Sequence, residues 1–407
     1  MAGPLSHIKV LDLSRVLAAP WAGQNLADLG AQVIKVERPG SGDDSRAFGP
    51  PWLKDAQGAD TRESAYFAAA NRGKKSITLN LSKPEGQELV RKLAAGVDVL
   101  LENYKHGDLA RYGLGYADLR KINPRLIYCS VTGFGQTGPY RERPGYDFMV
   151  QGMGGLMSIT GERDDLPGGG PQRVGVPIVD IMTGMYASIA VCAAIAHRAE
   201  TGVGQHLDLA LLDTQVAFLA NQAMNYLATG AVPERLGNAH PNIVPYQTFS
   251  TRDGAIILAC GNDNLFNKFC EVAACQALAA DPRFATNAKR VENRVEITAQ
   301  LNAVFARRST REWVEALEQA GVPNGPINNL KQVFEEPQVI ARGVKIEMDH
   351  PTAGKVPLVA SPMRFSETPV EYQLPPPTLG QHTDEILREV LKCSAAEIAR
   401  LRTEKIV

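Results

Sequence analysis

Asp180 stands alone among apolar residues, at a position where a carboxylate can act as a nucleophile. It is the only charged residue between Arg173 and His197, and it lies where an apolar run joins a helix predicted over 181–199. Aspartate at such a junction is a favoured helix cap. A helix N-terminus also stabilises an ionised carboxylate and opposes the rise in pKa that burial causes. The position therefore fits both a cap and an activated nucleophile.

A second group of side chains lies where predicted strands begin or end. Parallel α/β sheets bind ligands at the carboxyl ends of their strands, and arginine and lysine bind phosphate groups. Solvated surface residues give the same pattern, so a wet loop and an anion site both remain open. The side chains concerned are Arg38, Arg72, Lys74, Lys75, Asn103 and Arg111.

Other catalytic motifs are either absent from the sequence or lack the structural context that they need. GFGQTG (133–138) has dinucleotide-type glycine spacing, but Pro139 and the pair Pro144-Gly145 prevent the helix that a pyrophosphate site needs. The chain has no GxSxG, HExxH or H-x-E…CxxC arrangement, and its six cysteines form no CxxC pair. We expect no metal site and no permanently bound cofactor.

Composition restricts the partners of the chain. The 407 residues carry a net charge of −1, which provides no general basic field for nucleic acid or anionic membrane. The most apolar stretch, 182–197, is shorter than the roughly 20 residues of a membrane span, so we expect a buried helix there. Scattered cysteines indicate reduced thiols, and no targeting segment is evident. These features predict a soluble cytoplasmic protein without membrane or nucleic-acid partners.

The predicted elements form two domains. Apolar runs at 8–14, 31–37, 76–82, 97–103 and 125–131 alternate with helical patterns such as 21–29 and 84–95, which predicts a Rossmann-like parallel sheet with helices on both faces. After residue 230, a hairpin through Arg252-Asp253-Gly254 precedes helical patterns at 263–279, 288–306 and 310–320. We assign 1–205 to a large α/β domain, 206–229 to a linker helix, 230–330 to a small α+β domain and 331–407 to a C-terminal return to the large domain.

Several segments together resemble the family III CoA transferases, also called the CaiB/BaiF type. They are VLDLSRVLAAPWAGQNLADLGAQVIKVERPGSGDDSR, FAAANRGKKSITLNL, LLENYKHGDLARYGLGY, SVTGFGQTGPYRERPGYDFMVQ, VGVPIVDIMTGMYA and LGQHTDEIL. The segments GNAHPNIVPYQ, GVPNGPINNLKQVF and EMDHPTAGKV resemble most the succinyl-CoA:glutarate, or hydroxymethylglutarate, branch.

This resemblance implies a fold and a set of site residues. The fold is an interlocked homodimer in which the C-terminal tail completes the large CoA-binding domain. Asp180 falls at the nucleophile position, and the loop GNAHPN, with Gly237, Asn238 and His240, falls where related enzymes carry a glycine-rich lid. Leu17 replaces a glutamine of the formyl-CoA members, which argues against formate or oxalate as substrate. Positions that match the CoA-binding pattern are Ala18, Arg38, Arg72, Lys75, Asn103 and Arg111, with Tyr146 and Asp147 near the reacting carbonyl.

The implied activity is CoA transfer from an acyl-CoA, such as succinyl-CoA, to a dicarboxylic acid through an aspartyl-CoA thioester. Two alternatives remain. A 2-methylacyl-CoA racemase on the same fold would carry histidine in place of Tyr146, and tyrosine is a poor base at neutral pH. A non-catalytic CoA-binding protein would bind CoA without exchanging it between acids.

Overall fold

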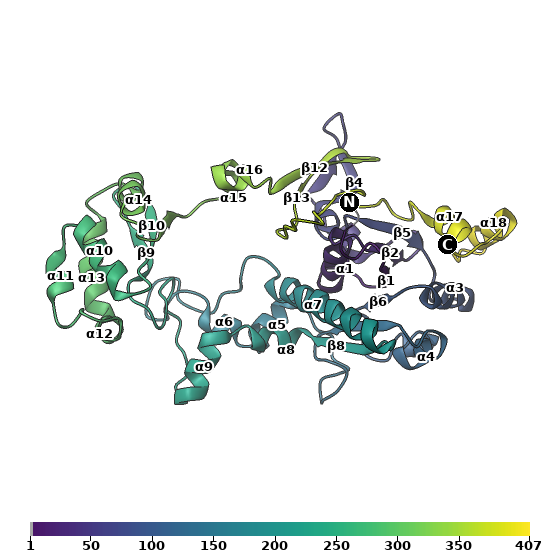
Figure 1. Cartoon of the computed structure of the whole chain (residues 1–407), viewed down its shortest axis with the longest axis horizontal. Helices are drawn as coiled ribbons and strands as arrows, with labels where there is room; N and C mark the ends of the chain where they lie inside the picture. Colours follow the sequence, from purple (N-terminus) through teal and green to yellow (C-terminus); the bar gives the residue numbers. More distant parts are fainter. Residues whose placement is uncertain (1–2) are drawn as a thin grey trace. The chain divides into compact units, whose positions relative to one another are not determined.

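The computed structural model describes residues 3–407, which form two compact units. Within the described residues, the first unit contains 3–154, 175–218 and 338–407, and the second contains 155–174 and 219–337. The chain therefore leaves the first unit twice, and its last seventy residues return to it (Figure 1). The short excursion at 155–174 has no counterpart among the predicted domains.

A six-stranded parallel sheet forms the centre of the first unit. Its strand order is β5-β2-β1-β6-β7-β8, and every neighbouring pair is parallel. This is the doubly wound order of Rossmann-type sheets, in which ligands bind where the order reverses, here between β1 and β6. The α/β prediction is confirmed. The strands are β1 (Lys9–Asp12), β2 (Gln32–Glu37), β5 (Lys74–Thr78), β6 (Val99–Glu102), β7 (Ile127–Thr132) and β8 (His206–Ala210).

Helices cover both faces of this sheet because its central strands are apolar on both sides. Val10 faces a core shared with α1 (Ala18–Asp28), α5 (Asp147–Met153), α7 (Ile178–Thr201) and α8 (Leu211–Ala217). Leu11 faces the opposite core, shared with α3 (Pro84–Ala95), α4 (Tyr116–Ile122) and the C-terminal helices. Smaller elements complete this half: η1 (Asp44–Ala47), β3 (Trp52–Lys54), β4 (Asp60–Ser64), α2 (Ala65–Ala69) and η2 (Ala110–Tyr112).

Helix α7 carries Asp180 and lies directly against α1. A Cβ on Gly184 would lie 2.5 Å from the carbonyl oxygen of Ala18, so only glycine allows this approach. By length and composition alone, α7 is the one helix within residues 3–407 that could cross a bilayer. In the structure its buried side chains, including Val179, Ala187 and Val191, belong to the core below the sheet.

The stretch assigned to the linker holds a short strand followed by two helices. Residues 206–210 form the edge strand β8, and the helix that follows is divided into α8 and α9 (Ala220–Thr229). The division occurs beside Ala220, whose φ of 46° interrupts the helical path. The boundary between the two units falls there, between Phe218 and Leu219.

The second unit has its own core of phenylalanines around Trp313. The predicted hairpin is confirmed: β9 (Tyr246–Ser250) and β10 (Ala255–Ala259) pair antiparallel, and β11 (Asn324–Pro326) adds a third strand. The helices of this unit are α6 (Leu156–Ile159), α10 (Asp263–Val272), α11 (Gln276–Ala280), α12 (Asn287–Glu292), α13 (Arg294–Phe305), α14 (Thr310–Gln319) and α15 (Leu330–Glu335).

The C-terminal tail packs on the free edge of the large sheet. The backbone N–H of Asn80, just after β5, donates to the carbonyl oxygen of Ile406 at 2.8 Å. Ile386, Leu387 and Ile398 are buried in the core beside α3. The tail elements are α16 (Pro337–Ala341), β12 (Lys345–His350), β13 (Gly354–Val359), α17 (Thr383–Glu385), η3 (Ile386–Val390) and α18 (Ala395–Thr403).

Candidate active site

Asp180 lies in the first turn of α7 and does not cap it. The capping position belongs to Pro177, which provides no side-chain hydrogen bond. The Asp180 side chain is half-buried, and its carboxylate accepts no hydrogen bond from any residue in 3–407. The interpretation of Asp180 as a helix cap is therefore wrong, and its oxygens are left available for chemistry.

Asp147 takes the capping role from another helix. Its Oδ2 accepts hydrogen bonds from the backbone N–H groups of Val179 at 2.8 Å and Asp180 at 3.3 Å. Its Oδ1 accepts from Gln151 Nε2 at 2.6 Å. The first residue of α5 thus satisfies the free N–H groups at the start of α7, which fixes the nucleophile candidate relative to α5.

Two glycines allow Asp147 to reach this position. A Cβ on Gly133, after β7, would lie 2.4 Å from the Cα of Gly145, just before α5. The two backbones cross in direct contact, which no other residue permits. GFGQTG is therefore a loop, and one of its glycines helps to place α5. Tyr146, between Gly145 and Asp147, is 70% exposed.

Burial and a neighbouring carboxylate set the electrostatics of Asp180. Burial raises its pKa, and the negative charge of Asp147 adds to the rise, which brings the pKa of Asp180 to about 7. Asp180 is consequently a poorly hydrated carboxylate that exchanges its proton near neutral pH, a property found at functional sites.

Tyr66, on α2, lies close enough to Asp180 to sense its charge. Burial raises the pKa of Tyr66 to about 12, and the carboxylates of Asp180, Asp147 and Asp43 contribute, in that order. The phenol therefore stays protonated and remains a hydrogen-bond donor. Tyr66 is therefore within electrostatic range of both Asp180 and Asp43, and Asp43 lines the pocket described next.

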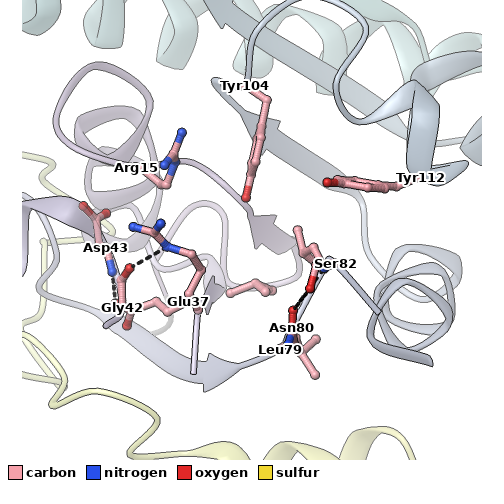
Figure 2. Close-up of a pocket in the computed structure, with 12 residues that line it drawn as sticks. Arg15, Glu37, Gly42, Asp43, Leu79, Asn80, Ser82, Tyr104 and Tyr112 are labelled. Atoms are coloured by element: carbon pink, nitrogen blue, oxygen red, sulfur yellow. Dashed lines mark hydrogen bonds between the residues drawn. The ribbon is translucent and has the colours of Figure 1, made fainter. Parts of the chain in front are cut away.

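A pocket of about 290 Å³ opens at the carboxyl ends of β1, β2, β5 and β6. Figure 2 shows Arg15, Glu37, Tyr104 and Tyr112 among the side chains around it. It lies at the point where the strand order reverses, the usual ligand position in such sheets. The lining residues are Arg15, Val36, Glu37, Arg38, Gly42, Asp43, Leu79, Asn80, Leu81, Ser82, Tyr104 and Tyr112.

The pocket has a cationic rim. Arg15 and Arg38 share one partner, Asp44: Arg15 Nη1 lies 2.9 Å from Asp44 Oδ2, and Arg38 contacts the other oxygen. Arg111 precedes the lining residue Tyr112, pairs with Asp108 and is largely exposed. Two arginines that converge on one carboxylate, with a third nearby, form an arrangement that suits phosphate.

The structure places two predicted cations elsewhere. Arg72 is buried and forms a bidentate pair with Asp28, at 2.9 and 2.6 Å, while its Nη1 donates to the carbonyl oxygen of Val359. Lys75 lies near the start of β5 and pairs with Glu385 of the tail. Neither side chain lines the pocket, because both hold the tail or the interior of the first unit together.

Asn103 holds the segment that carries Arg15, and Ala18 begins the helix that follows this segment. Ala18 is the buried first residue of α1. Asn103 accepts from the backbone N–H of Arg15 at 2.8 Å and donates to its carbonyl oxygen at 2.6 Å. Asn103 therefore orients a pocket residue.

The predicted lid residues belong to the second unit. Gly237 has a left-handed φ of 58°, and a Cβ there would lie 2.8 Å from a Glu162 carboxylate oxygen. His240 packs against Tyr246, and its Nδ1 accepts from the N–H of Asn242 at 3.0 Å. Burial and the nearby Arg294 lower the pKa of His240, so it is neutral at physiological pH. Asn238 lies in the turn between them.

Sequence reasoning missed Arg15, Tyr104, Tyr66 and Asp43. The first two were detectable, because they follow β1 and β6 by two or three residues, at the same sheet edge that pointed to Asn103. Tyr66 lies in the five-residue helix α2, and Asp43 lies just before the short helix η1, so no periodicity distinguishes either residue. Within residues 3–407, no group of three or more His, Cys, Asp or Glu side chains is placed to bind a metal ion.

Comparison with known proteins agrees with this geometry. Residues 5–383 match the model of CoA-transferase family III. The chain is 50% identical over 387 residues to the succinate–glutarate CoA-transferase of Agrobacterium fabrum, covering 95% of this chain and 96% of that protein. It is 45% identical over 404 residues to the human succinyl-CoA:glutarate CoA-transferase, covering 99% and 90%.

A solved structure extends the agreement to the fold. The crystal structure of a CaiB/BaiF family protein from Brucella suis has a TM-score of 0.83 and 50% sequence identity, and the comparison covers 96% of this chain and all of that one. An unpaired carboxylate of raised pKa, a cationic pocket at the reversal of the sheet and similarity along nearly the whole chain agree: this protein belongs to CoA-transferase family III.

Proposed function

We propose that the enzyme transfers CoA from succinyl-CoA to a dicarboxylic acid such as glutarate, with Asp180 as the covalent nucleophile. The observation that carries the proposal is the free, half-buried carboxylate of Asp180 at the start of α7, close to Tyr66. The acids are inferred from relatives that act on succinyl-CoA and glutarate at 45–50% identity. We also propose a cytoplasmic, interlocked homodimer.

The reaction proceeds in two symmetric halves. The Asp180 carboxylate attacks the thioester carbonyl of succinyl-CoA, the C–S bond breaks, and a mixed anhydride and CoA thiolate form. The thiolate attacks the aspartyl carbonyl, which releases succinate and leaves an aspartyl-CoA thioester. The acceptor carboxylate then attacks this thioester and displaces CoA thiolate, which finally attacks the acceptor's acyl group and regenerates Asp180. The thioester energy is conserved throughout.

The neighbouring residues have defined tasks in this scheme. Arg15, Arg38 and Arg111 bind CoA phosphates at the rim of the pocket. The protonated Tyr66 hydroxyl donates to the oxyanion that develops at the acyl carbon. We assign the loop at Gly237, Asn238 and His240 to the lid that excludes water, since each activated intermediate would otherwise hydrolyse.

Substitution of Asp180 tests the mechanism. Asp180→Asn and Asp180→Ala should each lower CoA transfer by at least about 10³-fold, because neither side chain can form the anhydride. Asp213 is a matched control: it occupies the same first-turn position in α8 and is exposed, so Asp213→Asn should keep full activity. Exchange of labelled succinate into succinyl-CoA is the readout. Near-normal exchange by either Asp180 variant would overturn the mechanism.

Further assays distinguish the CoA transferase from the two alternatives. Trapping with hydroxylamine during turnover should convert Asp180 to a hydroxamate that peptide mass spectrometry detects. A racemase would instead wash deuterium from solvent into the α-carbon of 2-methylacyl-CoA without moving CoA. A binding protein would retain CoA and exchange no label. A panel of C4–C6 dicarboxylates, read as newly formed CoA thioesters, identifies the acceptor.

A further inference from the structure

The segment that carries Arg15 into the pocket includes a strained residue. Val16 has a φ of 69°, in the left-handed region that a β-branched side chain strongly disfavours. It joins β1 to α1, between the pocket residue Arg15 and the first residue of the helix, Ala18. Strained backbone of this kind persists only where surrounding contacts impose it, and it is concentrated at functional sites.

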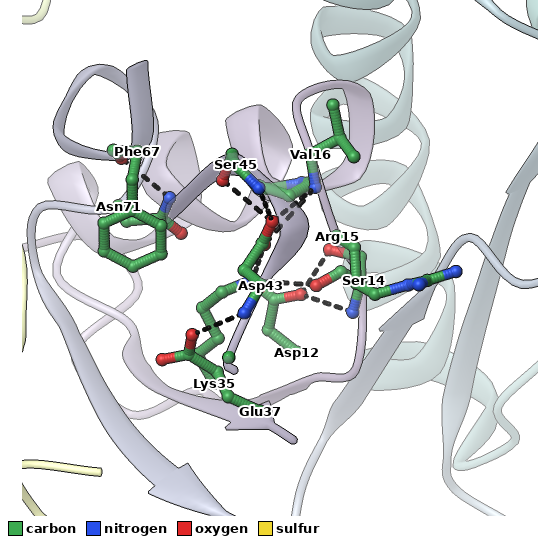
Figure 3. Close-up of polar contacts among 12 residues, drawn as sticks. Asp12, Ser14, Arg15, Val16, Lys35, Glu37, Asp43, Ser45, Phe67 and Asn71 are labelled. Atoms are coloured by element: carbon green, nitrogen blue, oxygen red, sulfur yellow. Dashed lines mark hydrogen bonds and ion pairs between the residues drawn. The ribbon is translucent and has the colours of Figure 1, made fainter. Parts of the chain in front are cut away.

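Buried charges impose this conformation. The N–H of Val16 donates to both carboxylate oxygens of Asp43, at 3.0 and 3.3 Å, and the N–H of Ser45 also donates to Asp43 at 2.9 Å. Lys35, whose side chain is 0% exposed, lies 2.8 Å from Asp43 Oδ2 and donates to the carbonyl oxygen of Ser14 at 2.7 Å. Figure 3 shows these contacts converging on the turn.

Three consecutive residues are therefore held by groups outside the segment. Lys35 holds Ser14, Asn103 holds both backbone groups of Arg15, and Asp43 holds Val16. A second buried pair, Lys74 with Asp12 at 2.9 Å, adjoins the segment, because Asp12 also accepts from the N–H of Ser14 at 2.9 Å. Burying ionised pairs costs solvation, and replacing such a pair by apolar residues is often neutral for stability. Stability alone therefore does not account for the arrangement.

We propose that Asp43, anchored by Lys35, is a positioning residue for CoA. It holds Val16 in the left-handed conformation, and this conformation directs Arg15 and the start of α1 toward bound CoA. The inference rests on the proposed function, because it names CoA as the occupant of the pocket. It goes further in assigning affinity to residues that hold the backbone in place. If only a tenth of the molecules keep the competent turn, the apparent Kd for CoA rises tenfold.

Glycine at position 16 provides the test, because glycine adopts positive φ without strain. Asp43→Asn should raise the Kd for CoA, measured by titration calorimetry, by about tenfold. Val16→Gly alone should leave the Kd within about twofold, and in the Asp43→Asn background it should restore most of the lost affinity. A merely structural role for Asp43 predicts no rescue by glycine.

Proline at the same position provides a second test that remains valid if Asp43→Asn fails to fold. Val16→Pro leaves every buried charge in place, but it fixes φ near −65° and removes the N–H, so it should weaken CoA binding by about tenfold. Asp98→Asn is a matched control. It breaks a different ion pair, that of Asp98 with Arg198 at 2.9 Å, beside the amino end of β6, and should leave the Kd unchanged.

The outcomes separate this inference from the proposed function. A wild-type enzyme that fails to bind CoA overturns both. A wild-type enzyme that binds CoA, with Val16→Pro and Asp43→Asn equally tight, overturns only the positioning role. Asp43→Asn that binds weakly and is not rescued by Val16→Gly also overturns it, because the loss would then lie outside the Val16 conformation. Rescue by glycine, with weak binding by Val16→Pro, supports it.

Discussion

In the proposed mechanism a single carboxyl group carries the reactivity of the enzyme, and its protonation should set the pH dependence of the rate. Folding raises the pKa of Asp180 from 3.8 to about 7, through burial and then the charge of Asp147. Only the ionised form attacks a thioester. We expect kcat/KM for succinyl-CoA to rise tenfold per pH unit below about 7 and to level off above it. A flat profile between pH 5.5 and 8 would contradict this assignment.

The same shift affects stability in the opposite direction. Because the folded state binds the Asp180 proton more tightly than the unfolded chain, the folded state loses stability as the pH rises from about 4 to about 7. Asp180→Asn removes this loss. We expect its Tm to exceed that of the wild type by roughly 2 °C at pH 8 and to equal it at pH 4, since solvent screens part of the effect at a half-buried site. Calorimetry at both pH values checks the sign.

If Arg15 and Arg38 bind phosphate as proposed, Asp44 is the residue that competes with it. It pairs with both Arg15 and Arg38, and these side chains remain partly exposed. An anionic ligand must share or displace this partner. Asp44→Asn should therefore tighten CoA binding by about threefold, within the small range of exposed ion pairs. The surface pair of Asp60 with Lys54 is the control, and Asp60→Asn should change nothing. Weaker binding by Asp44→Asn would show that Asp44 orients the arginines instead.

At the scale of elements, the first residue of helix α5 caps the start of helix α7. Asp147, at the start of α5, caps α7 and also raises the pKa of Asp180. Asp147→Asn keeps an acceptor for the Val179 N–H but removes the charge. We expect the pH profile of kcat/KM to move to lower pH, while the Tm falls by less than in Asp147→Ala, which loses the cap at about 1 kcal/mol. A profile that does not move would mean that burial alone sets the Asp180 pKa.

Sequence patterns predicted the positions of strands and helices better than they predicted contacts between side chains. The ends of β1, β2, β5, β6 and β7 lie within four residues of the ends of their apolar runs, because burial on both faces demands continuous apolar residues. The cap of α7 was not predictable, since Asp147 lies 33 residues before Asp180 and reaches it only through the Gly133–Gly145 crossing. Arg72 is a residue type that binds phosphate, but its guanidinium group is already paired with Asp28, 44 residues away in the sequence. Contacts between residues so distant in sequence produce no local pattern from which they could be predicted.

For the whole molecule, the end of the chain supports a segment that lines the pocket. Residues 79–82 line the pocket, and Asn80 bonds through its backbone to Ile406 and through its side chain to Lys405. Ile406 is itself buried in the core beside α3. The last residues of the sequence therefore fix a surface built by residues more than three hundred positions earlier.

This connection predicts that a distant substitution weakens ligand binding. Ile406→Ala leaves a cavity that costs about 2–4 kcal/mol and loosens the Asn80 contact, so hydrogen exchange should accelerate at 79–82 and the Kd for CoA should rise. Leu317→Ala is the matched control, because it makes a similar cavity in the separate core of the second unit. It should leave both exchange at 79–82 and CoA affinity unchanged. Equal effects from the two variants would mean that the tail stabilises the enzyme only globally, with no specific support for the pocket wall.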